Sequence, residues 1–184
     1  MGGLDPALFF CYTQNVEQDA LNTLRDEIHQ WHLRNYPKDD LDSALLGVYE
    51  EYGELCRTQL KQDGGIRGTW EEWQLEKFKE AGDVMIGLLN VAGFLGVPVS
   101  TLSLDLLEFR NLPNIKRLLL NAGITLGYFL EDVEEYCIDQ VFIEIVVYLH
   151  ACKLDPIEAL KSRWETISKR DFIKNPATGG REQE

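Results

Sequence analysis

Apolar residues recur along the chain at intervals of three and four positions, which is the spacing of one face of an α-helix. No stretch shows sustained alternation of apolar and polar residues, so strands are not expected. Turn residues such as Pro37, the glycine pair at 64–65, Pro98 and Pro113 separate the helical segments. The pattern predicts an all-α protein, with helices over residues 16–33, 41–62, 69–95, 100–109, 115–122, 126–152 and 156–173.

Two helix starts have recognisable capping residues. Asp39 or Asp40 precedes the helix at 41–62 and can accept from its free backbone N–H groups. Thr69 and Glu72 have the spacing of a capping box, which predicts that the next helix begins there. Gly96 and Pro98 are expected to end that helix.

Residues 1–174 are expected to form a single helical domain, with one half over 16–110 and a second half over 115–174. Residues 175–184 are rich in Gly and polar residues and are expected to be a flexible tail. Residues 126–134 resemble residues 46–54, so the second half is interpreted as a degenerate, shortened repeat and the fold as two helical hairpins sharing a core. Chance similarity between amphipathic helices is the alternative.

Composition restricts the partners. The 184 residues include 18 Lys and Arg against 31 Asp and Glu, a formal net charge of −13. This charge argues against a nucleic-acid polymer or an anionic membrane as the main partner, but not against a small anion held through a metal ion. The nearly uncharged run at 84–104 contains three glycines and a proline, and is interpreted as a buried helix and a turn rather than a membrane span.

The N-terminus lacks the features of a signal peptide, and the four cysteines lack zinc-finger spacing. A reduced, cytoplasmic protein is therefore expected.

Two pairs of carboxylates suggest chemistry. Glu51 and Glu54 are three residues apart on one predicted helix, and Glu80 and Asp83 are three apart on the next, so each pair shares a helix face. If the two helices pack antiparallel, the four carboxylates can converge. Converging carboxylates repel one another unless a cation lies among them, and oxygen ligands suit Mg²⁺ or Mn²⁺.

The helix at 69–95 gives the stronger argument. Glu80, Asp83, Gly87 and Asn90 fall within roughly 80° of each other on a helix that is otherwise apolar from residue 84 onward. Helices that are apolar on every side are usually buried, and buried carboxylates are costly unless they are paired or bind a metal. On the preceding helix, Glu51 and Glu54 lie away from the apolar stripe and are also compatible with ordinary solvated residues.

These residues resemble the all-α nucleoside triphosphate pyrophosphohydrolases, which include MazG-like proteins, dimeric dUTPases, dCTP pyrophosphatases and phosphoribosyl-ATP pyrophosphohydrolases. The shared signature is Glu-x-x-Glu followed, about 25 residues later, by Glu-x-x-Asp. The flanking segments are also similar to MazG: Trp31-His32-x-x-Asn35-Tyr36-Pro37, Leu46-Gly47-x-x-Glu50-Glu51-x-Gly53-Glu54-Leu55, residues 62–68, Gly82-Asp83-Val84, Leu95-Gly96-Val97, and residues 164–172.

The resemblance implies a MazG-like helical bundle that cleaves a nucleoside triphosphate between its α- and β-phosphates, yielding the monophosphate and pyrophosphate. It implies that Glu51, Glu54, Glu80 and Asp83 hold Mg²⁺, with Mn²⁺ as a possible substitute, and that one of them, or Glu50, orients the attacking water. Relatives are usually dimers or tetramers with sites between subunits, so a homo-oligomer is expected.

Substrate contacts are assigned to residues near these motifs. For the cations among them, the alternative is a solvated side chain, and for the tryptophans it is packing in the core. Trp70 and Trp73 are further candidates for stacking on a base. The candidates are Lys61, Arg67, Asn90, Trp31, Lys169 and Arg170.

The chain departs from the family pattern between residues 100 and 139. Glu131 and Glu134 match the first pair, but Cys137 and Gln140 replace the second, so a second copy would be structural. Three functions stay open: a Mg²⁺-dependent pyrophosphohydrolase clearing modified or excess nucleotides, a catalytically decayed nucleotide sensor or assembly protein of the same fold, and an unrelated acidic bundle that binds a protein.

Overall fold

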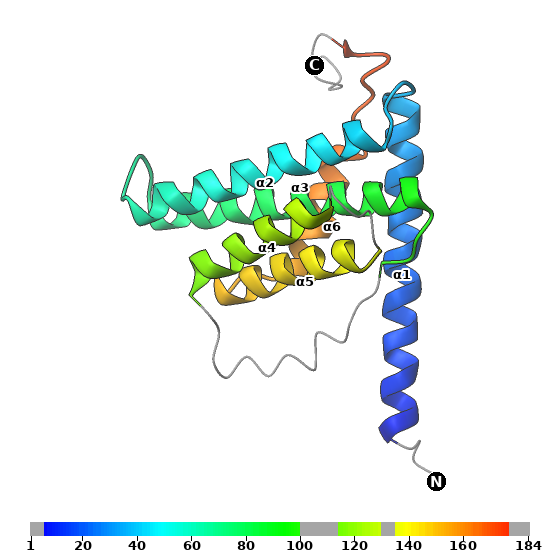
Figure 1. Ribbon diagram of the computed structural model, residues 1–184, viewed down its shortest axis with the longest axis horizontal. Coiled ribbons are helices and arrows are strands. Elements are labelled where there is room, and N and C mark those ends of the chain that lie inside the picture. The colour runs from blue at the N-terminus through cyan, green and yellow to red at the C-terminus, as the bar shows by residue number, and fades with distance from the viewer. Residues whose placement is uncertain (1–5, 100–113, 130–134, 177–184) are drawn as a thin grey trace.

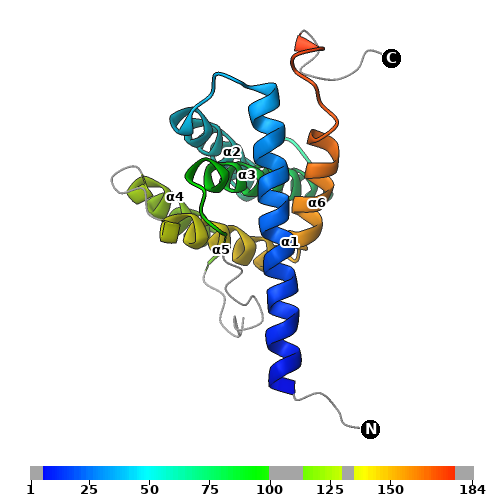
Figure 2. The ribbon, with the colours of Figure 1, turned by 90° about the vertical axis from the view of Figure 1, so that its right-hand side faces the viewer.

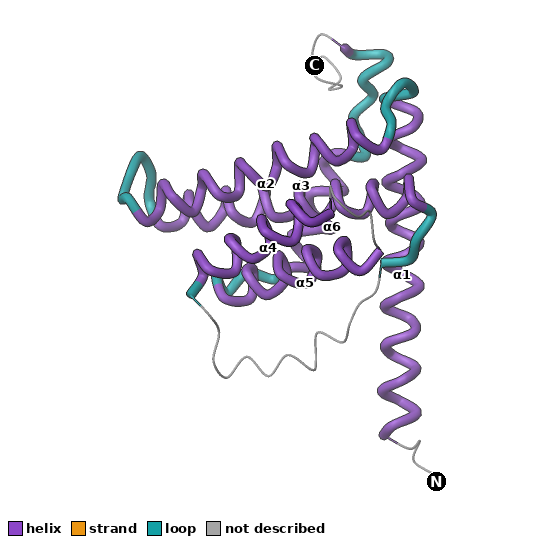
Figure 3. Tube along the Cα trace, viewed as in Figure 1, coloured by secondary structure: helices purple, strands orange, loops and turns teal. Residues whose placement is uncertain are grey.

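The computed structural model describes residues 6–99, 114–129 and 135–176, and every regular element in these ranges is an α-helix (Figure 3). The all-α prediction is therefore confirmed for the described part of the chain. The six helices are α1 (Pro6–Asn35), α2 (Leu41–Asp63), α3 (Trp70–Leu95), α4 (Ile115–Phe129), α5 (Glu135–Ala151) and α6 (Pro156–Ile167).

Helix α3 is the centre of the bundle. It packs against α1, α2, α5 and α6, whereas α4 packs mainly on α5. The α2–α3 hairpin lies alongside the α4–α5 hairpin, and α1 crosses the end of both (Figure 1). Turned by 90°, the bundle shows α6 beside α1 and the N-terminal half of α1 extending beyond the other helices (Figure 2). The structure therefore contains two helical hairpins, but the predicted helix at 126–152 is not one element, because α4 ends at Phe129 and α5 begins at Glu135.

The core explains why α3 is apolar on nearly every side from residue 84 onward. Val84, Leu89, Val91 and Ala92 are fully buried, because neighbouring helices cover α3 all round. Helices α2, α4, α5 and α6 each contribute one apolar stripe to the same cluster, including Val48, Ala122, Ile145 and Ala159.

The predicted caps of α2 and α3 are confirmed. The Asp40 side chain accepts from the Ser43 backbone N–H, and Thr69 and Glu72 form a reciprocal capping box. Gly96 ends α3 in the left-handed conformation, with φ of 67°, which glycine adopts at little cost.

Four helix boundaries predicted from the sequence are wrong. α1 begins at Pro6 instead of residue 16, with proline at the first helical position, where its missing N–H is harmless. α4 ends at Phe129 instead of residue 122, and the next helix, α5, begins at Glu135 instead of residue 126. Gly123 is useful within α4 because an added Cβ would lie 2.7 Å from the Tyr52 hydroxyl, which donates to the Leu119 carbonyl.

The fourth wrong boundary is the end of α6, which lies at Ile167 rather than residue 173. The chain leaves the helix to dock on the C-terminal end of α1. The Phe172 backbone N–H donates to the Asn35 side chain at 2.8 Å, and the Trp31 indole donates to the Arg170 carbonyl at 3.2 Å. These contacts join the segment after α6 to the C-terminal end of α1.

Several expectations lie outside the described residues: the helix at 100–109, the Glu131 and Glu134 pair, and most of the tail at 175–184. Within the tail, the Asn175 backbone N–H donates to the Asp171 carbonyl at 2.9 Å. Among the described helices, none has the length and apolar character needed to cross a membrane.

Substitution of helical glycines tests the close contact between α3 and α6. An added Cβ at Gly82 would lie 2.6 Å from Arg163 Cγ and 2.8 Å from the Ala159 carbonyl oxygen. We expect Gly82→Ala to lower the free energy of unfolding by about 1–3 kcal/mol, because the two helices must move apart. Gly53→Ala is the matched control, since nothing lies within 4 Å of its added Cβ, and it should stabilise by about 0.5–1 kcal/mol. Urea unfolding measures both, and equal effects would contradict the packing described.

Candidate acidic metal site

Three of the predicted carboxylates come together. Glu51 on α2 and Glu80 and Asp83 on α3 each offer an oxygen atom, and these three atoms all lie within 4.8 Å of one another. The pairing of α2 with α3 brings the two sequence motifs face to face.

Gly87 helps to explain how α2 approaches α3 here. It lies one turn beyond Asp83, and a Cβ added to it would lie 2.9 Å from Val48 Cγ2 on α2. The missing side chain lets the helices approach closely enough for Glu51 to reach the α3 carboxylates. The gap at residue 87 in the polar stripe is therefore a packing requirement.

Arg163 of α6 completes the cluster, and sequence reasoning missed it. Its Nε and Nη2 atoms donate to the two oxygens of Asp83 at 2.9 and 2.7 Å, a bidentate ion pair. Both side chains are largely buried, with 17% exposure for Arg163 and 10% for Asp83. The only local signal was an arginine beside the buried Ala159 and Leu160, and the partner lies 80 residues away.

Burial and mutual repulsion raise the pKa values of the carboxyl groups in the cluster. Desolvation, followed by the charges of Asp83, Glu80 and Glu50, raises the pKa of Glu51 to about 7. Desolvation and neighbouring acids also raise the pKa of Glu80. Desolvation raises the pKa of Asp83 although the hydrogen bond and charge of Arg163 act to lower it. The site thus contains more negative charge than one arginine neutralises.

The remaining predicted carboxylates lie at the edge of the cluster. Glu54 is ion-paired to Arg57, and it is close enough to Glu80 for its charge to help raise the pKa of Glu80. The Glu50 side chain is exposed, and its charge is one of those raising the pKa of Glu51. Neither contributes an atom to the three-carboxylate cluster.

The predicted substrate contacts are dispersed. Asn90 is buried, with Oδ1 3.1 Å from Nδ1 of His29 on α1. Trp31 is buried among aromatic rings, including Trp164 and Phe172 at centroid distances of 5.9 and 6.1 Å, which supports the core alternative. Arg170 is half-buried, and its charge acts to lower the pKa of Asp83, so it lies near the cluster.

The other three cations lie apart from the cluster atoms. Lys61 is paired with Glu76 at 3.2 Å, and Lys169 with Glu165 at 3.4 Å. Arg67 is exposed in the loop between α2 and α3, with φ of 51°. The structure places none of these three against Glu51, Glu80 or Asp83.

The donor set fits a hard divalent cation. Three ionised carboxylates and one guanidinium leave two net negative charges, which one Mg²⁺ or Mn²⁺ would balance. A bidentate arginine uses one lone pair on each Asp83 oxygen, so each oxygen keeps another for a metal. Glu51, Glu80 and Asp83 would hold the ion, and Glu54 would need to leave Arg57 to join them.

No protein-family model, curated protein or solved structure matches this chain.

The pH dependence of stability tests the repulsion around Glu51. Because folding raises its pKa from 4.5 to about 7, the folded state favours the protonated acid; stability falls as pH rises between these values and then levels off. In metal-free buffer, Glu51→Gln should stabilise the protein by about 1–2 kcal/mol at pH 8, a value reduced because the side chain is partly solvated, and by almost nothing at pH 4. Thermal unfolding at the two pH values measures this, and a gain that is independent of pH would refute it.

A double-mutant cycle tests the Asp83–Arg163 pair. Arg163→Met keeps most of the packing volume but leaves the Asp83 carboxylate buried without its partner, so we expect a loss of about 3 kcal/mol at pH 7. Adding Asp83→Asn should restore most of that loss. Arg57→Met is the control, because its side chain is 61% exposed and its pair with Glu54 should contribute less than about 1 kcal/mol. Equal losses for the two arginines would be inconsistent with a buried pair.

Proposed function

We propose that this protein is a Mg²⁺-dependent nucleotide pyrophosphohydrolase of the MazG-like type, which converts (d)NTP to (d)NMP and pyrophosphate. The observation that supports it most is the convergence of Glu51, Glu80 and Asp83 from the two sequence motifs onto one point between α2 and α3. A nucleotide-pool clearing role accords with this reaction.

The charge of the cluster restricts the substrate chemistry. An acidic site in a protein of net charge −13 repels a bare triphosphate. A divalent cation between carboxylates and phosphates reverses that repulsion, and Mg²⁺ bound there would supply Lewis-acid stabilisation of the phosphoryl charge.

The residues of the chain then have separate tasks. Glu51, Glu80 and Asp83 hold the ion, and Arg163 fixes the orientation of Asp83 from α6. We assign the positioning of water to one of the clustered carboxylates rather than to Glu50, because the Glu50 side chain is exposed. Arg170, half-buried near Asp83, is the best placed of the predicted substrate-binding cations.

We also propose that the protein forms a homo-oligomer, a dimer or tetramer. The N-terminal half of α1 extends past the bundle in both views, which leaves a long helical segment available to a second copy (Figures 1 and 2).

One observation favours a second candidate, the catalytically decayed sensor or helical assembly protein. Both oxygens of Asp83 already accept from Arg163, so Asp83 is held in a structural ion pair that needs no metal. In that case the protein would bind a nucleotide without hydrolysing it, or would bind another protein.

Pyrophosphate release distinguishes the two candidates. Standard and modified NTPs and dNTPs would be tested with Mg²⁺, with Mn²⁺ and with EDTA. We expect metal-dependent pyrophosphate from at least one substrate, and loss of turnover by a factor of about 10³ or more in Glu80→Gln, because the metal loses a ligand. Glu71→Gln is the control, since Glu71 is an exposed acid in the first turn of the same helix.

Release by Glu80→Gln at the wild-type rate would contradict the metal assignment, and so would full turnover by Asp83→Asn. Absence of pyrophosphate release by the wild-type protein from every substrate tested would favour the decayed sensor or assembly protein.

A further inference from the structure

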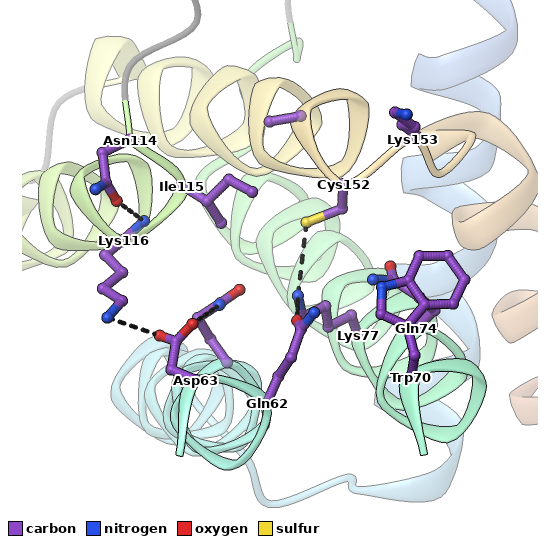
Figure 4. A pocket seen from close by; sticks show the side chains of 12 residues that line it. Gln62, Asp63, Trp70, Gln74, Lys77, Asn114, Ile115, Lys116, Cys152 and Lys153 are labelled. Carbon is purple, nitrogen blue, oxygen red and sulfur yellow. Dashed lines mark hydrogen bonds and ion pairs between the residues drawn. The ribbon is translucent and has the colours of Figure 1, made fainter. Parts of the chain in front are cut away.

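A second feature of the structure is a cavity of about 670 Å³ lined by none of the clustered carboxylates. It lies where the end of α2 and the start of α3 face the start of α4 and the end of α5 (Figure 4). Its volume is in the range of sites that bind small molecules of nucleotide size.

Lys77 is the unusual residue of this cavity. It is 1% exposed, yet its hydrogen-bond partners are neutral: the Gln62 side-chain oxygen and the Cys152 thiol, the latter at 3.9 Å (Figure 4). Its ammonium group also lies 5.9 Å from the centre of the Tyr148 ring. A buried ammonium without a carboxylate partner is costly, and burial lowers its pKa accordingly.

The nearby Asp63 carboxylate compensates this charge only in part, since burial still lowers the pKa of Lys77. Asp63 lines the same cavity, but it is paired with Lys116 at 3.1 Å and accepts from the Gln59 amide at 3.0 Å. Lys153 also lines the cavity. The lining therefore contains three lysines and one aspartate, a net charge of +2 in a chain whose net charge is −13.

Gln74 supplies an independent observation. Its side chain lies beside Trp70 and Lys77 in the cavity (Figure 4) and is 91% buried, since its exposure is 9%. Its Oε1 atom has no hydrogen-bond partner among the described residues. Buried amide oxygens almost always accept a hydrogen bond, so this atom is suited to a donor that enters the cavity.

Trp70 completes the cavity with an aromatic surface. It belongs to the first turn of α3 and is 57% exposed, so its ring is accessible to a planar group. An exposed tryptophan at the edge of a polar cavity is a common stacking partner for aromatic ligands.

We propose that this cavity is a second ligand site, which takes a small anion of mononucleotide size with a planar polar ring. The phosphate or carboxylate of the ligand binds Lys77, with Lys153 nearby. A hydroxyl or ring N–H of the ligand donates to Gln74 Oε1, and the ring stacks on Trp70. This site does not depend on the metal cluster or on the hydrolytic function proposed above.

Binding in EDTA separates this site from the acidic cluster. The probes are the four ribonucleoside monophosphates as aromatic phosphates, orotate and anthranilate as aromatic carboxylates, and inorganic phosphate as an anion without a ring. Calorimetry measures binding, and tryptophan fluorescence reports on Trp70. We expect saturable binding of at least one aromatic anion, and the class that binds identifies the anionic group that the site accepts.

Variants place the binding in the cavity. Lys77→Met and Gln74→Leu should each weaken the affinity at least tenfold, which corresponds to about 1.4 kcal/mol. Glu80→Gln should leave binding unchanged because it alters only the acidic cluster, and Lys161→Met controls for the loss of one exposed lysine. If Lys77→Met fails to fold, as judged by its melting curve, the affinity of Gln74→Leu for the aromatic anion tests the proposal by itself.

Three results would overturn the proposal: no saturable binding of any aromatic anion up to about 5 mM, affinity that is unchanged in Gln74→Leu, or inorganic phosphate binding as tightly as the aromatic phosphates. If the wild-type protein releases no pyrophosphate but still binds an aromatic anion in this cavity, the result counts only against the hydrolytic function.

Discussion

Helix α3 brings two carboxylates into the interior of the bundle, and the surrounding helices are arranged around the need to compensate their charge. Asp83 lies where α6 packs on α3, and the absence of a side chain at Gly82 lets the Arg163 stem and the α6 backbone come close. Glu80 and Asp83 also face Glu51 on α2, which adds negative charge rather than removing it. One guanidinium against three carboxylates leaves a deficit of positive charge, and this deficit is the physical reason to expect a divalent cation.

The same helix has the opposite character on the side that faces α5. There Lys77 is buried against the Cys152 thiol and the Tyr148 ring, without a carboxylate partner. α3 thus has an acidic cluster whose carboxylates outnumber the one guanidinium beside them. One turn earlier it has a buried lysine without a carboxylate partner. Their hydrogen-bond partners differ, Arg163 for Asp83 and Gln62 for Lys77, and the described ion pairs include none between Lys77 and the acidic cluster. A cation would satisfy the first site and an anion the second.

Local features of the sequence predicted what depends on local contacts. Thr69 and Glu72 begin α3, Gly96 ends it, and the i,i+3 spacing of Glu80 and Asp83 places both on one face, as the structure shows. Apart from the meeting of Glu51 with Glu80 and Asp83, contacts between distant segments were not predictable. From the sequence alone, Arg163 is a charged residue in an amphipathic helix, and only the packing of α6 on α3 shows that it pairs with Asp83. Lys77 would be expected at the surface because lysines are seldom buried. The end of α6 was placed too late because its periodicity continues, whereas docking of Phe172 on Asn35 turns the chain away.

Direct binding of Mn²⁺, followed by electron paramagnetic resonance at pH 6 and pH 8, tests the central claim that Glu51, Glu80 and Asp83 form a metal site. Because the cation requires the ionised form of Glu51, whose pKa is raised to about 7, we predict saturable binding that is clearly tighter at pH 8 than at pH 6 and is lost in Glu80→Gln. Absence of a saturable site at pH 8, or binding that Glu80→Gln leaves intact, would contradict the account.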